Sequence, residues 1–114
     1  MHYELSKSQK KIARTIIDKG LNIHYIKILK DAESIISDWS KGKFKDSREA
    51  YMKLYSSVRK NDKHLGQIYD DKGGSRWIEI IAFQLSDGVI TIEDLRDFDE
   101  EVRNTIVQWS RILE

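Results

Sequence analysis

Apolar residues recur along the first third of the chain at the spacing of two helices. The pattern predicts a first helix over residues 7–19, with Ile12, Ile16 and Ile17 on one face, and a second over residues 23–41. The second carries the most regular apolar stripe: Tyr25, Ile28, Leu29, Ala32, Ile35, Ile36 and Trp39. Such a stripe usually faces the interior, so we expect these side chains to be buried.

The pattern continues over residues 47–71, after a cap at Asp46 or Ser47. This stretch is expected to be one long helix, or two nearly collinear helices broken at Asn61–Asp62. Its tyrosines (Tyr51, Tyr55 and Tyr69) fall on the apolar stripe, which places them in the core.

The segment 76–87 is the most apolar in the protein. A helix is favoured over a strand because Ser75 can cap it, Gly88 can end it, and its polar residues recur at helical spacing. Gln84 falls within its apolar arc, where an amide needs hydrogen-bond partners. A short helix over 92–98, capped by Thr91, and a last helix capped by Asp99 complete the prediction.

Glycine supplies the breaks between these elements because the chain contains no proline. Gly20, Gly42 and Gly88 each follow a helical pattern, where a left-handed residue commonly ends a helix. The expected fold class is all-α: a compact multi-helical single domain over residues 1–114, with five to seven mostly antiparallel helices and an apolar central helix near residues 76–87.

Composition narrows the class of protein. The 114 residues include no cysteine, which excludes disulfides, thiolate metal sites and cysteine nucleophiles. Basic and acidic residues nearly cancel at 20 and 19, so the chain is no polyelectrolyte. The apolar runs fall short of the roughly 18 residues that a membrane span needs. We therefore expect a cytoplasmic protein with no membrane partner.

Catalytic motifs are not evident in the sequence. The three histidines (His2, His24 and His64) match no metal-ligand spacing. Residues 86–95 resemble the end of an EF-hand loop, but the first two ligand positions would be Phe83 and Leu85, which carry no carboxylate. We expect no catalytic residue, no metal and no cofactor, although an enzyme with dispersed residues around His64, Asp70 and Arg76 stays an alternative.

The best local candidate for a ligand site is the glycine pair before the helix at 76–87. Two glycines leave backbone N–H groups open at a helix N-terminus, and nearby cations add positive charge. The resulting anion or phosphate cradle would comprise Lys72, Gly73, Gly74, Ser75 and Arg76, with His64 and Arg59 in reach.

Two further features bear on partners. Residues 41–76 hold ten basic and five acidic side chains, interleaved with tyrosines, which makes nucleic-acid binding an alternative. Phe44 and Phe83 are candidate partner-binding residues, because they fall outside the main apolar stripes. A helical core without a recognisable set of catalytic residues favours a non-catalytic interaction module. Such a module would act through a protein partner or as a homodimer.

Overall fold

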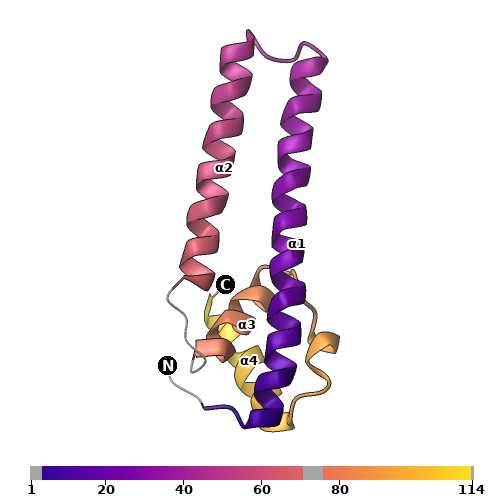
Figure 1. Ribbon diagram of the computed structural model, residues 1–114, viewed down its shortest axis with the longest axis vertical. Helices are drawn as coiled ribbons and strands as arrows, with labels where there is room; N and C mark the ends of the chain where they lie inside the picture. The colour runs from indigo at the N-terminus through magenta and orange to yellow at the C-terminus, as the bar shows by residue number, and fades with distance from the viewer. Residues whose placement is uncertain (1–3, 71–75, 114) are drawn as a thin grey trace. The chain divides into compact units, whose positions relative to one another are not determined.

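The computed structural model describes residues 4–70 and 76–113, and within these ranges the protein is all-helical (Figure 1). Four α-helices are present: α1 (Lys7–Ser40), α2 (Ser47–Tyr69), α3 (Trp77–Ser86) and α4 (Glu100–Leu113). A 3₁₀ helix, η2 (Ile92–Leu95), lies between the last two. None of these described helices combines the length and apolar character of a membrane span.

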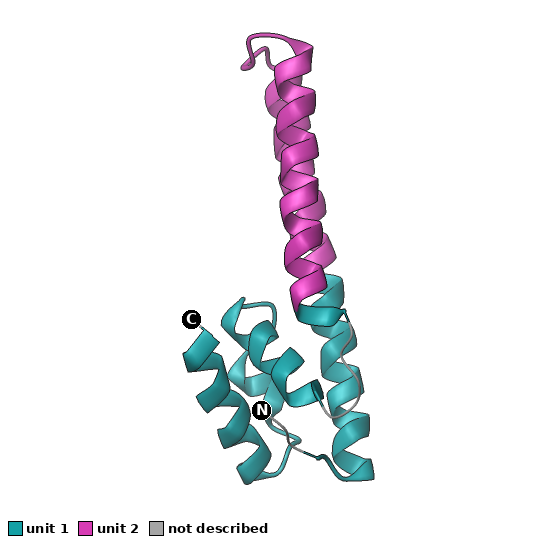
Figure 2. Cartoon of the chain, turned by 90° about the vertical axis from the view of Figure 1, so that its left-hand side faces the viewer, with its two compact units in different colours: residues 1–23, 68–114 teal, residues 24–67 magenta. Residues whose placement is uncertain are grey.

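The chain folds into two compact units (Figure 2). Unit 1 comprises residues 1–23 and 68–114, and unit 2 comprises residues 24–67, with the boundaries inside α1 and α2. The single domain expected over residues 1–114 stays a prediction, and each unit is described by itself below.

The helix count of five to seven is wrong, because α1 runs through the break expected at Gly20. Gly20 is an interior residue of α1 rather than its C-terminal cap. A Cβ built on Gly20 would lie 2.4 Å from Nε2 of Gln84 on α3, so the glycine is needed for a close side-chain approach. The stretch 47–69 is likewise one unbroken helix, with Asp46 accepting the cap hydrogen bond from the Glu49 N–H at 2.8 Å.

Two glycines end helices where the sequence predicts, whereas η2 and the start of α3 differ from the prediction. Gly42 and Gly88 both have φ of 73°, the left-handed conformation in which glycine commonly ends a helix. Thr91 and Asp94 form a reciprocal capping box at η2, which ends at Leu95, earlier than expected. Ser75, the predicted cap of α3, lies outside the described residues, and Arg76 occupies the N-cap position.

The core of unit 1 forms around α3, as the sequence predicts. Ile78 and Ile81 of α3 pack with the first turns of α1 and with Val102 and Ile106 of α4. Full burial of an isoleucine stabilises a fold by roughly 1.5–3 kcal/mol. Gln84 is fully buried among these residues and donates to the carbonyl of Ile17 and to the Tyr69 hydroxyl, each at 2.9 Å.

Unit 2 is an antiparallel helical hairpin: the second half of α1, the tip at residues 41–46, and α2 as far as residue 67 (Figures 1 and 2). Ile35 and Ala50 are buried. Trp39 links the two helices near the tip by a hydrogen bond, in which its indole N–H donates to the Ser47 hydroxyl at 3.0 Å. The hairpin carries most of the exposed large apolar side chains in the described chain.

Candidate functional site

The candidate site is an apolar surface along one side of the unit 2 hairpin. Seven side chains there are each 46–68% exposed although they are large and apolar or aromatic. We call this surface the hairpin face; it consists of Tyr25, Leu29, Ile36 and Trp39 on α1 with Tyr51, Tyr55 and Val58 on α2. The expectation that these side chains fill the core is wrong.

Helix geometry places both sets of residues on the same side of the hairpin. Ile36 follows the buried Ile35 by one residue, and Tyr51 follows the buried Ala50 by one residue, which is about 100° around each helix. Both helices are right-handed and run in opposite directions, so this rotation turns both side chains toward the same face. The exposed residues of α1 and those of α2 therefore form one continuous surface.

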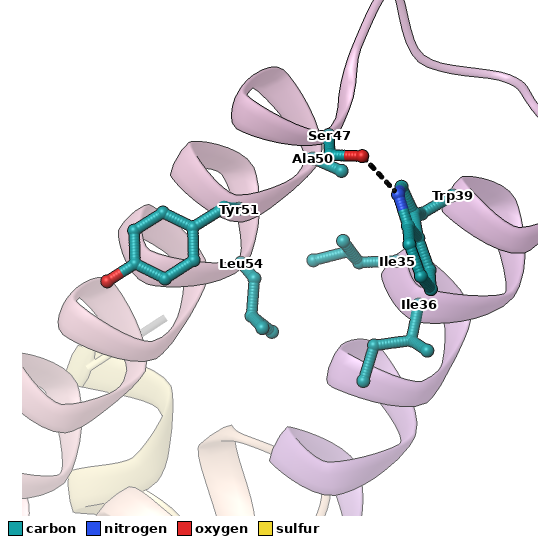
Figure 3. A pocket seen from close by; sticks show the side chains of 7 residues that line it. All are labelled: Ile35, Ile36, Trp39, Ser47, Ala50, Tyr51 and Leu54. Carbon is teal, nitrogen blue, oxygen red and sulfur yellow. Dashed lines mark hydrogen bonds between the residues drawn. The ribbon is translucent and has the colours of Figure 1, made fainter.

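A pocket of about 360 Å³ lies on this face near the tip (Figure 3). Ile36 and Trp39 project into it from α1, while Tyr51 and Leu54 line it from α2 (Figure 3). The Ser47 hydroxyl at its edge already accepts from the Trp39 indole. The pocket is therefore suited to apolar groups and offers little for catalysis.

The opposite flank of the hairpin is polar. Exposed lysines follow it on both helices, at Lys27 and Lys30 on α1 and at Lys53 and Lys60 on α2. The Lys53 ammonium lies 5.7 Å from the ring centroid of Phe44, a half-buried residue of the tip. The seven residues that define the hairpin face are uncharged, whereas the opposite flank carries these exposed lysines.

The predicted anion cradle is described only in part, since Lys72, Gly73, Gly74 and Ser75 lie outside the described residues. Arg76, in unit 1, forms a two-pronged pair with Glu79, with N···O distances of 2.9–3.1 Å. Arg59 and His64 belong to unit 2. The cradle therefore stays a prediction, as does the enzyme that would use His64, Asp70 and Arg76.

His64, Phe44 and Phe83 are the other residues that the sequence singles out. The His64 ring meets the ring of the buried His24 edge-on, with centroids 6.2 Å apart. Phe83, on α3 in unit 1, is half-buried, whereas Phe44 belongs to unit 2. Partner binding through Phe44 and Phe83 stays a prediction.

Sequence reasoning found the hairpin-face residues but misjudged their exposure. The signal that could have corrected this is the width of the α1 stripe, which spans about a third of the helix circumference from Ile35 to Leu29. One neighbouring helix covers only part of such a stripe. Its outer edge, with Tyr25, Leu29 and Ile36, needs a second covering surface.

Comparison with known proteins shows a similar fold but does not assign the chain to a family. No family model matches the chain, and no curated protein matches it significantly. A solved structure of the Fluorescence Recovery Protein from Synechocystis sp PCC 6803, an arginine-to-lysine mutant, is similar with a TM-score of 0.77. The match covers 95% of this chain and 99% of that chain at 18% sequence identity. At this identity the likeness shows a shared helical fold.

Proposed function

We propose that the protein is a non-catalytic interaction module that pairs with a second copy of itself through the hairpin face. The observation that carries this proposal is the exposure of seven large apolar side chains on one side of one hairpin. Tyr25, Trp39, Tyr51 and Tyr55 are each 48–63% exposed, and an aromatic side chain can bury roughly 150–250 Å². Leu29, Ile36 and Val58 extend this surface, and contiguous apolar patches on monomers rarely exceed about 300–600 Å².

A second copy suits this surface for two reasons. Two antiparallel hairpins that meet face to face form a four-helix bundle, and a twofold axis lets the same patch serve both partners. The seven residues carry no charge, and the lysines lie on the other flank. Pairing through these seven residues therefore sets uncharged side chains of the two copies against each other, and a stable complex buries about 800 Å² per partner.

The similar solved structure fits an interaction role. Its name, Fluorescence Recovery Protein, describes an effect and names no substrate or reaction. We infer for the present chain a regulatory module that acts by contact with protein. Its location in the cytoplasm is part of the same proposal.

Sedimentation velocity tests the pairing. The wild-type protein is expected to sediment as a dimer at micromolar concentration, and Leu29→Glu as a monomer. A carboxylate at this position would be buried without a partner, which costs several kcal/mol and raises the dissociation constant at least about a hundredfold.

Ser34→Glu is the matched control because Ser34 is exposed on the same helix, points away from the hairpin face, and gives the same charge change. This variant should stay dimeric. A wild-type protein that remains monomeric at high concentration contradicts the proposal, and so does equal dissociation of the two variants.

A further inference from the structure

A second surface of unit 2 follows the side of α2 that points away from α1. Six side chains line a groove of about 510 Å³ along it, at intervals of three or four residues. We call it the basic groove; it comprises Met52, Tyr55, Ser56, Arg59, Lys60 and Lys63. Tyr55 belongs to both the hairpin face and the basic groove, whereas Ser56 and Lys63 lie on the side of α2 opposite the residues that turn toward α1.

The groove carries a concentrated positive charge. Arg59, Lys60 and Lys63 are exposed, and within the described part of the chain no carboxylate pairs with them. Asp62 is the sole acidic residue between positions 50 and 69. Three cations at positions 59, 60 and 63, on one side of α2, create a field that attracts acidic groups.

The other end of the groove is apolar. Met52 is 50% exposed and Tyr55 is 48% exposed. Tyr51 stacks on the Tyr55 ring with centroids 6.4 Å apart, and the Arg59 guanidinium lies 5.7 Å from the same ring centroid. These contacts fix the positions of the Tyr55 and Arg59 side chains. A ligand in the groove therefore meets apolar side chains at one end and cations at the other.

This combination favours a protein partner over a nucleic acid. Single-stranded nucleic acids bind by stacking bases on free aromatic faces, but the Tyr55 ring is already engaged by Tyr51 and Arg59. Met52 offers a flexible thioether that suits an apolar side chain.

We infer that the basic groove binds an acidic amphipathic helix of a partner protein. The groove spans eleven residue steps of α2, about 16 Å, or three helical turns. A partner helix of that length can set an apolar residue against Met52 and carboxylates against Arg59, Lys60 and Lys63. This inference rests on the proposed role as an interaction module and names the chemistry of the partner.

Fluorescence anisotropy tests the inference with labelled probes. The main probe is an amphipathic peptide of leucine and glutamate, about 18 residues long, and the second is the same peptide with lysine in place of glutamate. The acidic peptide is expected to bind and the basic one to fail. Arg59→Glu with Lys63→Glu should weaken binding at least about tenfold, because it places like charges opposite each other.

Lys30→Glu with Lys41→Glu is the matched control, since it changes the net charge equally at exposed sites outside the groove. It should leave binding within about twofold of wild type. Equal weakening by both pairs overturns the inference, since only net charge would then matter. Binding of single-stranded DNA without peptide binding also overturns it and assigns the groove to nucleic acid.

The oligomeric state of each variant separates this inference from the proposed self-association. A dimer that fails to bind the acidic peptide removes the basic groove proposal and leaves the pairing intact. A monomer that binds the acidic peptide removes the proposed pairing and leaves the basic groove proposal intact. Circular dichroism of both charge variants checks that α2 remains helical.

Discussion

Gly20 and Gln84 are the residues on which the packing of unit 1 depends most sharply. The Gln84 side chain is fully buried and its Nε2 donates to Ile17 and Tyr69, while its Oε1 has no partner among the described residues. A Cβ at position 20 would lie within 2.4–3.0 Å of three atoms of this amide. Gly20 therefore leaves room for an amide that joins three segments of unit 1.

Gly20→Ala is expected to lower the free energy of unfolding by about 1–2 kcal/mol. The methyl group displaces the Gln84 amide from its hydrogen bonds, which costs about 1–3 kcal/mol, and the helix propensity of alanine offsets about 1 kcal/mol of this. Urea unfolding followed by circular dichroism measures the change.

A Gln84→Ala background supplies the control for this substitution. With the amide removed, the methyl group has space, so Gly20→Ala should become neutral or stabilising by up to about 1 kcal/mol. The same loss in both backgrounds would contradict the proposed contact between these two residues.

Asp94 gives the folded protein a pH-dependent contribution. Hydrogen bonds from Lys19 and from the Thr91 N–H lower the pKa of this carboxyl below its ordinary value. A lowered pKa in the folded state stabilises the protein above the unfolded pKa of about 3.9, and this contribution is lost as the pH falls through the folded pKa.

Asp94→Asn keeps an oxygen for the Thr91 N–H and removes the charge. It is expected to lower the free energy of unfolding by less than about 1 kcal/mol at pH 7, because Lys19 is half exposed. The difference from wild type should shrink between about pH 5 and pH 3. Unfolding curves over this range measure it, and a difference independent of pH would contradict the assignment.

The hairpin tip is an element whose geometry depends on one backbone conformation. Gly42 ends α1 with φ of 73°, and its N–H donates to the Trp39 carbonyl at 3.0 Å. No atom would obstruct a Cβ there, so a substitution changes backbone strain alone. Gly42→Ala should lower the free energy of unfolding by about 1 kcal/mol, and Gly42→Asn by less, because asparagine tolerates this conformation. Thermal unfolding of both variants tests this order.

Local sequence signals predicted most helix ends but failed at Gly20. A glycine that ends a helix and a glycine inside one can have the same kinds of neighbours in sequence, and only φ separates them. At Gly42 and Gly88 local capping decides the conformation. At Gly20 the need for glycine comes from the close approach of Gln84, which is 64 positions away in the chain. The pattern of residues around position 20 does not contain this information.

The exposure of the hairpin face has only an indirect signal in the sequence, the width of the α1 stripe, for a related reason. Periodicity shows that Tyr25, Leu29, Ile36 and Trp39 share one side of a helix, and it gives no information on what covers that side. The Asp46 cap and the continuous α2 were predictable because they are local. The anion cradle at residues 72–76 was argued from local residue types alone, and its outcome rests on segments outside the described residues.

At the scale of the whole molecule, the near-neutral charge conceals a division between the units. Residues 24–67 hold ten basic and six acidic side chains, whereas residues 1–23 and 68–114 hold ten and thirteen. The basic unit is also the one with the exposed apolar face. The two proposed contacts therefore both fall on the hairpin, and unit 1, with its buried Ile78 and Ile81, supplies a stable core.

Pairing through the hairpin face also makes stability depend on protein concentration. A dimer that dissociates on unfolding is stabilised by mass action, so its Tm rises as concentration increases. The wild-type Tm is expected to rise over a hundredfold concentration range, whereas that of Leu29→Glu should stay constant. Scanning calorimetry measures both. A constant wild-type Tm would show that the exposed apolar side chains are not covered by a second copy, and the hairpin face would then need a different partner.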